Sequence, residues 1–293
     1  MSTKIPYAQE TINPFFGCSK VSEGCLHCYA EQMAFRCTQM DPHSKYKGVI
    51  GPDKKWNGEI GFDYASMTKP FSWKKGKVIF VCSMGDVFHE TIKMLYLTRL
   101  FDLFEKCPQH WFLLVTKRPE VALRMSNSLA FKDYFELPNI MIIVTAENQQ
   151  RFNERIPILL QIPHVKKGVS IEPMLGCIDT IIDIDPLNWG GYTRRNTLTG
   201  MLSNPIRDSY CATPVSKLDW VIAGCESGNP HREMDEDWIR SLRFQCKNSE
   251  VPFYFKQKYI GRKKIQNPLL DGEALQEYPE FLLKTFKNQE NAI

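Results

Sequence analysis

Short apolar runs recur along the chain and are separated by longer stretches of mixed polarity. A continuous apolar run of about four to eight residues is typical of a strand that is buried on both faces of a parallel sheet. The pattern predicts six such strands and a seventh just before the first cysteines. In chain order, the predicted strands lie near Glu10–Pro14 and at Val78–Val81, Trp111–Val115, Ile140–Val144, Val169–Ile171, Trp220–Ala223 and Pro252–Phe255.

Stretches with helical character lie between these runs, at Ile92–Cys107, Glu120–Ser126, Asn148–Gln161 and Asp235–Asn248. The alternation of strands and helices predicts an α/β fold. The chain shows no internal repeat and no low-complexity tract. We therefore expect residues 1–293 to form a single TIM-like (β/α) barrel, partial or complete, rather than two domains. Long connections at about 36–77 and 186–218 are expected to be insertions into this barrel.

Polar residues follow the predicted strands at the points where the strands end. They are Cys82–Asp86, Thr116–Arg118, Thr145–Asn148, Ser170 with Glu172, Gly224–Gly228, and Lys256–Gln257. The carboxyl ends of the parallel strands in a barrel share one rim, and that rim holds the active site. The pattern therefore favours a shared site, although polar residues also cap strands wherever loops begin.

Three cysteines, Cys18, Cys25 and Cys28, lie within eleven positions in a C-x6-C-x2-C pattern. A closed zinc site needs four ligands, and a [4Fe–4S] cluster normally takes four cysteines. Three thiolates suit a cluster in which one iron keeps an open position for a substrate or cofactor. Two other interpretations are a zinc site completed by His27, which is poorly placed between two of the cysteines, and three unrelated reduced thiols.

Composition and charge narrow the class of protein. The 293 residues include ten cysteines. The chain contains no run of about 18 apolar residues, so we expect no membrane span. The N-terminus lacks an apolar signal core, so we expect a cytoplasmic protein with mostly reduced thiols. The net charge of +4 is compatible with a polyanionic partner.

Basic residues are interleaved with aromatic residues in three segments. Residues 36–77 hold nine Lys or Arg against four Asp or Glu, together with Tyr46, Trp56, Phe71 and Trp73. The segments 188–197 and 256–264 have the same character. This combination suits phosphate contacts and base stacking, while solvated loops whose aromatic residues finish the core are the other interpretation. A basic surface also suits an acidic electron donor such as a flavodoxin.

The sequence resembles a phage-associated three-cysteine-motif family of the radical SAM superfamily. The resemblance begins at Asn13 with "FFGCSKVSEGCLHCYAE" and covers almost the whole chain in order. Further matching stretches are "WNGEI", "VIFVCSMGDVFHE", "LLVTKRPE", "VTAENQQRFNERIPILLQIP", "VSIEPMLGCID", "VIAGCESG", "VPFYFKQ" and "NPLLDG". The departures are local: Cys225 stands where a glycine is expected, and Thr145 where a serine is expected.

The resemblance implies a barrel of the radical SAM type, with a [4Fe–4S] cluster on Cys18, Cys25 and Cys28 and S-adenosylmethionine beside it. The implied cofactor-binding residues are Tyr29, Ser83, Met84, Gly85, Asp86, Lys117, Arg118, Thr145, Glu147, Asn148 and Ser170. Among them, Asp86 would accept from the cofactor's ammonium and Lys117 or Arg118 would meet its carboxylate. Glu147 or Asn148 would hold the ribose, and Tyr29 would pack on the cluster or the adenine. Glu172, Glu226 and Lys117 are the candidate catalytic residues, with Glu226 as a polar anchor.

The predicted function is that of a radical SAM enzyme. Reductive cleavage of S-adenosylmethionine would give a 5′-deoxyadenosyl radical, which abstracts hydrogen from a nucleic-acid base or nucleotide-derived substrate, as in the DNA base modification of phages. The other hypotheses are a radical SAM enzyme acting on a peptide or small metabolite, and a zinc-stabilised nucleic-acid-binding protein. Expected partners are DNA or a nucleotide and a flavodoxin- or ferredoxin-type electron donor, in a cytoplasm that includes that of a phage-infected host.

Overall fold

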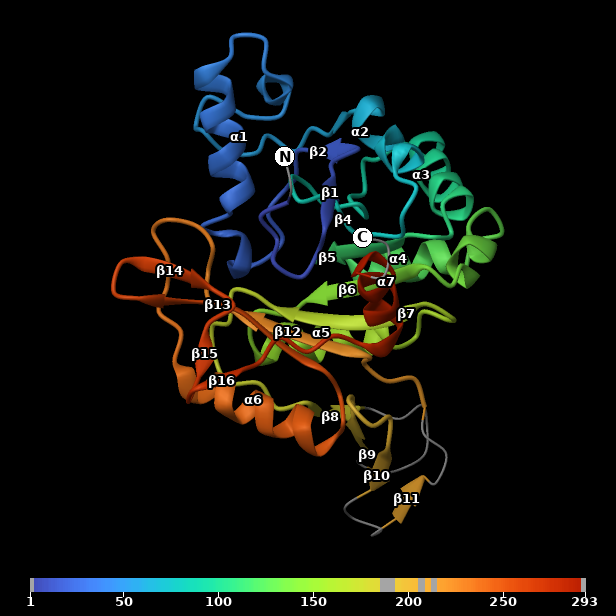
Figure 1. Ribbon diagram of the computed structural model, residues 1–293, viewed down its shortest axis with the longest axis vertical. Helices are drawn as coiled ribbons and strands as arrows, with labels where there is room; N and C mark the ends of the chain where they lie inside the picture. The colour runs from blue at the N-terminus through green and yellow to red at the C-terminus, as the bar shows by residue number, and fades with distance from the viewer. Residues whose placement is uncertain (1–2, 185–192, 205–208, 212–214, 291–293) are drawn as a thin grey trace.

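The computed structural model describes residues 3–184, 193–204, 209–211 and 215–290, and it is built around one curled sheet (Figure 1). The sheet has eight strands in the order β1-β4-β5-β6-β7-β12-β13-β14. Their bounds are β1 Glu10–Ile12, β4 Val78–Val81, β5 Trp111–Thr116, β6 Ile140–Thr145, β7 Lys166–Ile171, β12 Trp220–Gly224, β13 Phe253–Ile260 and β14 Lys263–Gln266. The first seven pair in parallel, and β14 pairs antiparallel to β13. The sheet forms a half-barrel, and all seven predicted strands are confirmed.

Helices of the strand–helix repeats cover the convex face of this sheet. They are α3 Met94–Lys106, α4 Pro119–Ser126, α5 Gln149–Leu159 and α6 Glu236–Asn248, which confirms the four predicted helices to within about two residues. Two of them start at side-chain caps: Asn148 accepts from the Arg151 N–H, and Asp235 accepts from the Asp237 N–H. Remaining helical segments are α1 Tyr29–Met40, α2 Tyr64–Thr68, α7 Glu280–Glu290 and the short 3₁₀ turns Glu23–Cys25, Lys45–Gly48, Lys69–Ser72 and Lys132–Glu136.

Alternation of side chains along the strands separates two buried layers. Ile79, Phe112 and Ile142 pack in the larger layer, under the helices of the convex face. Phe80 and Leu113, one position on, belong to a second cluster on the concave face. The concave cluster also contains Tyr7 from the N-terminal segment and Leu282 from α7, together with Met141, Ile143, Trp220, Ile222 and Tyr254. The inside of the half-barrel is therefore a packed core below its carboxyl-end rim.

The first insertion packs some of its aromatic residues against the body of the protein. Its short strand β3 Gly61–Phe62 pairs with β2 Phe15–Phe16. Tyr46 lies edge-on to Phe16, and Trp73 packs on the main core. Phe71 is exposed. For Tyr46 and Trp73, completion of the core is thus the confirmed interpretation.

The second insertion contains a small antiparallel sheet. Its strands are β8 Ile181–Ile184, β9 Thr193–Asn196, β10 Leu202–Asn204 and β11 Ser209–Cys211. The part of the basic, aromatic segment at 188–192 lies outside the described residues. Within the described ranges, no helix is long and apolar enough to cross a membrane.

Candidate functional site

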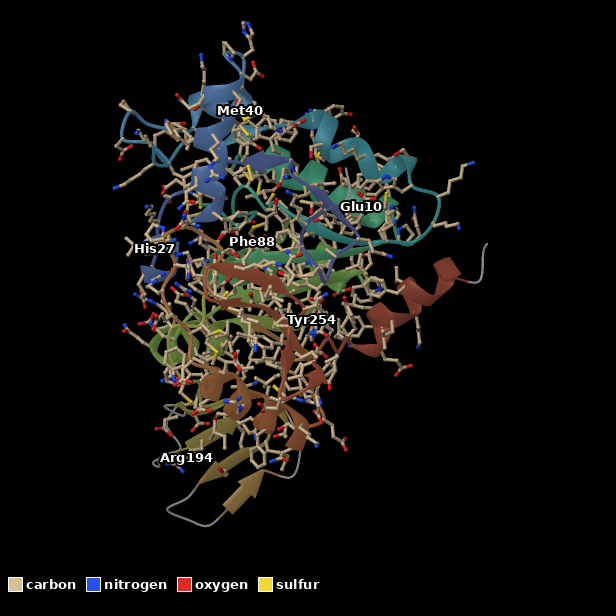
Figure 2. The ribbon with its side chains drawn as sticks, turned by 60° about the vertical axis from the view of Figure 1, so that its left-hand side comes forward. Glu10, His27, Met40, Phe88, Arg194 and Tyr254 are labelled. Atoms are coloured by element: carbon tan, nitrogen blue, oxygen red, sulfur yellow. The ribbon has the colours of Figure 1, made fainter. Side chains whose placement is uncertain are left out.

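A cavity of about 850 Å³ opens at the carboxyl ends of the parallel strands. In Figure 2, His27 of the cysteine segment lies on one side of the molecule, and Glu10, at the amino end of β1, lies toward the other. The cavity is lined by all but two of the residues predicted to form the site. Those present are Cys18, Cys25, Cys28, Tyr29, Ser83, Met84, Gly85, Asp86, Lys117, Arg118, Thr145, Ser170, Glu172 and Glu226, and those absent from its wall are Glu147 and Asn148.

Strand periodicity explains why several polar side chains reach this cavity. Leu113 and Ile143 belong to the concave cluster, and Lys117 and Thr145 continue the same alternation toward the rim. Lys256 follows Tyr254 in the same way. The cavity floor is therefore the polar layer above the apolar interior of the half-barrel.

The three cysteines lie on a segment that we call the cysteine loop, residues 17–28. Cys18, Cys25 and Cys28 are half-buried free thiols that line the same cavity. In the part of the chain that the structure describes, no group of three His, Cys, Asp or Glu residues converges on a point for one metal ion. A cubane cluster makes a different demand, because each thiolate binds its own iron. Three thiols facing one cavity fit such a donor set.

Arg118, at the end of β5, connects the cysteine loop to the barrel. Its side chain is 1% exposed. The guanidinium donates to the carbonyl and hydroxyl oxygens of Ser19, at 3.1 and 2.8 Å, and its Nη1 lies 3.8 Å from Cys18 Sγ. Burial raises the pKa of the Cys18 thiol to about 12, and Arg118 opposes this rise. Arg118 thus holds the loop and favours the thiolate form of its first cysteine.

Asp86, after β4, holds Arg118 in turn. Its carboxylate accepts from the Phe88 N–H at 3.0 Å, the Thr116 hydroxyl at 2.7 Å, the Lys117 N–H at 3.1 Å and Arg118 Nη1 at 3.2 Å. These four donors match the number of lone-pair sites that a carboxylate offers. The geometry favours a positioning role for Asp86, and its contact with a cofactor ammonium stays a prediction.

Glu147 and Asn148, after β6, also contact the cysteine loop. Glu147 is fully buried; it accepts from the Gly24 N–H at 3.1 Å and from Arg155 Nη1 at 2.9 Å. Burial alone would raise the pKa of Glu147, but the charges of Arg155 and Lys117, together with hydrogen bonds to the carboxylate, outweigh burial and lower the pKa. The Asn148 amide donates to Glu23. Both predicted ribose ligands therefore have partners in the loop, away from the cavity wall.

The segment after β12 provides a third attachment for the cysteine loop. Glu226, which is 3% exposed, accepts from His27 Nδ1 at 3.0 Å, with that ring nitrogen as donor, and from the Nε and N–H of Arg232 at 3.0 and 2.9 Å. Burial opposes ionisation of Glu226, but its bonds to Arg232 and His27 lower its pKa. A Cβ on Gly228 would lie 2.0 Å from the His27 carbonyl oxygen, so only glycine allows this approach. The polar anchor predicted at Glu226 binds the loop.

Glu172 and Lys117 remain directed at the cavity. Oε1 of Glu172 accepts from Lys256 Nζ at 2.5 Å, Ser227 Oγ at 3.1 Å and Gln257 Nε2 at 3.2 Å. The Lys117 ammonium makes no ion pair with any described residue. These two side chains are the candidate catalytic residues that stay available to a bound molecule.

A family model matches residues 2–279, and its description is "Protein of unknown function (DUF5131)". The chain belongs to this family. A search of curated proteins finds no match, and a search of solved structures finds none either. The functional argument for this DUF5131 protein therefore rests on its own sequence and geometry.

Several residues of the DUF5131 site had no role assigned to them from the sequence. Lys256 and Gln257, predicted at the shared rim as residues that follow a strand, form the cluster around Glu172. Cys82 also lines the cavity; it is 2% exposed, has a left-handed backbone at φ +63°, and burial raises its pKa. Arg232 could not be found from spacing, because nothing local marks it as the partner of Glu226.

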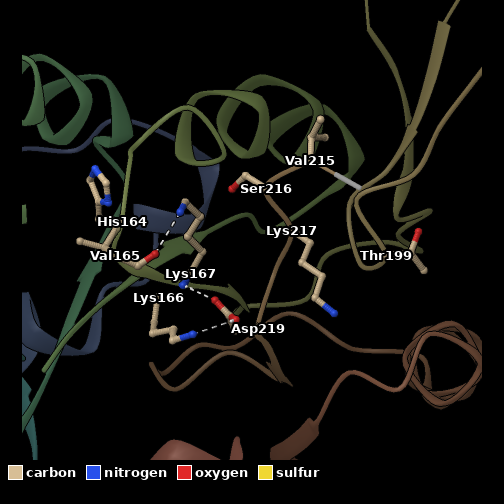
Figure 3. Close-up of a pocket in the computed structure, with 9 residues that line it drawn as sticks. All are labelled: His164, Val165, Lys166, Lys167, Thr199, Val215, Ser216, Lys217 and Asp219. Atoms are coloured by element: carbon tan, nitrogen blue, oxygen red, sulfur yellow. Dashed lines mark hydrogen bonds and ion pairs between the residues drawn. The ribbon is translucent and has the colours of Figure 1, made fainter. Parts of the chain in front are cut away.

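A second cavity, of about 420 Å³, lies at the amino ends of β7 and β12 (Figure 3). Three of its charged residues, Lys166, Lys167 and Asp219, contact one another or the backbone. Lys167 Nζ donates to the Val165 carbonyl at 2.9 Å, its N–H donates to Asp219 at 2.8 Å, and Lys166 Nζ lies 3.9 Å from Asp219. None of the predicted site residues of this DUF5131 chain lines it.

Proposed function

We propose that this protein is a radical SAM enzyme whose substrate is a nucleic-acid base or a nucleotide-derived molecule. The supporting observation is that Cys18, Cys25 and Cys28 face one cavity at the carboxyl ends of a half-barrel. The sequence resemblance to the three-cysteine-motif family points to the same chemistry. Buried charged groups from three strand ends hold the loop that carries these thiols.

The three cysteines would hold a [4Fe–4S] cluster, and the cavity beside them would take S-adenosylmethionine. When bound, the reduced cluster would supply one electron for the reductive cleavage of S-adenosylmethionine to methionine and a 5′-deoxyadenosyl radical. The side chains of this chain bind and orient. Lys117, whose ammonium makes no ion pair with any described residue, would pair with the cofactor carboxylate, and Tyr29 would pack against its adenine.

The rest of the cavity protects the reaction and holds the substrate. Below the rim, the concave cluster is apolar and fully packed, so water cannot approach from that side. Glu172 presents a carboxylate that Lys256 and Gln257 keep in place. This carboxylate is positioned to accept a hydrogen bond from the substrate.

An electron donor of the flavodoxin or ferredoxin type would reach the outer side of the cysteine loop. Leu26 is 57% exposed and Val21 is 38% exposed there, next to the cysteines. Exposed apolar side chains beside a redox centre suit a short-lived contact with a small donor protein.

The test is anaerobic reconstitution with iron and sulfide, followed by S-adenosylmethionine and dithionite. We expect about four irons per chain and formation of 5′-deoxyadenosine. Cys28→Ala abolishes both, whereas Cys177→Ala, at an exposed cysteine outside the cavity, leaves both unchanged. One zinc per chain with no iron, or 5′-deoxyadenosine formed equally by Cys28→Ala, would refute the proposal.

A further inference from the structure

More positive than negative side chains line the large cavity. Each of its three carboxylates has a cationic partner: Asp86 pairs with Arg118, Glu172 with Lys256, and Glu226 with Arg232. Four other cations line the same cavity and make no ion pair with any described residue. They are Lys4, Arg36, Lys117 and Lys264.

A buried donor on the cavity wall adds to this excess. Trp56 lines the cavity, and its indole Nε1 is buried without a hydrogen-bond partner among the described residues. Leaving such a donor unsatisfied costs about 1–3 kcal/mol, so an acceptor supplied by a ligand would recover that cost. Indole N–H groups and unpaired cations share one class of ligand, which is an anion with several oxygens.

The cofactor does not account for all of these cations. S-adenosylmethionine carries one carboxylate beside two positive groups, and Lys117 on the cavity floor suffices for that carboxylate. Arg36, Lys4 and Lys264 remain. They come from three separate places: α1, the N-terminal segment, and β14, where Gln266 donates to the Lys4 carbonyl at 3.0 Å.

The arrangement of these elements indicates a track rather than one compact anion site. In Figure 1, α1 stands on one side of the carboxyl ends of the strands and β14 on the other. A triphosphate concentrates its charge at one end of a molecule, whereas the phosphates of a nucleic-acid strand are spread along it. Cations on both sides of a cavity match the second distribution.

An aromatic ring is available between these walls. Tyr29 begins α1, lines the cavity and is 40% exposed, and its hydroxyl donates to the Ser83 carbonyl at 2.8 Å. A ring fixed at one end and open on its face can stack on a base as well as on the adenine of a cofactor. A base inside a duplex cannot reach the cavity floor unless it leaves the stack.

We infer that the cavity binds a single-stranded nucleic-acid segment, with phosphates on Arg36 and Trp56 at the α1 wall and on Lys4 and Lys264 at the β14 wall. This inference rests on the proposed function for the use of the site and names its substrate class as a polymer strand. The target nucleotide lies over the floor, between the two walls.

The test is fluorescence anisotropy of the full chain with a labelled single-stranded oligodeoxynucleotide of about ten nucleotides over a salt series. We expect Arg36→Gln and Lys264→Gln each to weaken binding about three- to tenfold. Each variant should also reduce the steepness of the plot of log K against log salt concentration, by about 0.7 for each phosphate that it no longer neutralises. Trp56→Phe removes the N–H together with part of the ring but no charge, so it weakens binding without a change in slope. Lys132→Gln, at an exposed lysine outside the cavity, is the matched control and leaves binding unchanged.

Three results would overturn the inference: no binding of the oligonucleotide at low salt, equal affinity in the Arg36, Lys264 and Lys132 variants, or competition by a nucleoside triphosphate as strong as that by the oligonucleotide. Formation of 5′-deoxyadenosine by the wild-type chain is measured in parallel. If that activity is present without oligonucleotide binding, the strand site is wrong and the proposed function stands. If the oligonucleotide binds as expected but the chain takes up no iron, the proposed function is wrong and the strand site stands.

Discussion

Replacement of Arg118 tests whether buried charge at the strand ends holds the cysteine loop. Arg118→Lys keeps a positive charge near Asp86 but cannot reproduce both bonds to Ser19 and the contact with Cys18. A hydrogen bond to a charged group contributes about 1.5–3 kcal/mol, and part of that survives through the shorter side chain. Arg118 Nε also donates to both carboxylate oxygens of Glu90, which is half-exposed, and this contact adds only about 0–1 kcal/mol. We expect Arg118→Lys to destabilise the loop by about 2–3 kcal/mol.

Arg118→Leu has a larger effect because it also leaves Asp86 as a buried carboxylate without its cation. The side chains of this pair are 2% and 7% exposed, and breaking such a pair costs about 3–5 kcal/mol. We therefore expect Arg118→Leu to destabilise the loop more than Arg118→Lys does. The control, Glu90→Gln, should destabilise it by about 1 kcal/mol or less.

Hydrogen exchange followed by mass spectrometry measures this effect where it occurs. A loss of about 2–3 kcal/mol corresponds to about 30- to 150-fold faster exchange in peptides of residues 17–28. Peptides from β6, inside the sheet, keep their protection in Arg118→Lys. Equal exchange of the loop in wild type and Arg118→Lys, or an effect of Glu90→Gln as large as that of Arg118→Lys, would refute the reasoning.

Three further predictions concern a glycine, a lysine and a histidine. Gly228→Ala places a Cβ 2.0 Å from a backbone oxygen of the cysteine loop and should destabilise the protein by about 1–3 kcal/mol in urea unfolding. At Gly176 an added Cβ would meet nothing within 4 Å, so Gly176→Ala should change the free energy of unfolding by less than about 0.5 kcal/mol. Equal effects of the two variants would contradict the close approach at Gly228. Lys117→Gln should weaken S-adenosylmethionine binding about tenfold in calorimetry with iron content unchanged, and a loss equal to that of Lys132→Gln would remove Lys117 from the cofactor site. Burial lowers the pKa of His110. The contribution of the neutral ring to the free energy of unfolding is therefore fully present above about pH 6.5 and is lost as the pH falls through the lowered folded-state pKa. Protonation of the His110 ring near pH 6.5 in an NMR titration would contradict this.

Apolar runs were sufficient to predict the parallel strands, because both faces of the sheet are buried. Ile142 and Ile143 are adjacent and pack in opposite layers, and each must therefore be apolar. The small sheet in the second insertion was not predicted, since its strands are short and mostly polar. The place of α7 on the concave face also depends on tertiary packing, through Leu282.

The location of the site could be predicted from the sequence, but the partners of its charged residues could not. Residues after parallel strands must share one rim, and this predicted that Asp86, Glu172 and Glu226 would line a common cavity. The sequence does not show which acids are already neutralised. Glu226 pairs with Arg232 and His27, and the second partner is 199 residues away, so its role in holding the loop required the structure.

The most direct measurement of the central claim is the electron paramagnetic resonance spectrum of the reconstituted, dithionite-reduced protein with and without S-adenosylmethionine. Three thiols that leave one iron open predict the signal of a reduced [4Fe–4S] cluster, and a shift of that signal when the cofactor binds to the open iron. A cluster signal that S-adenosylmethionine leaves unchanged would contradict the account, and so would a protein that retains zinc and shows no signal.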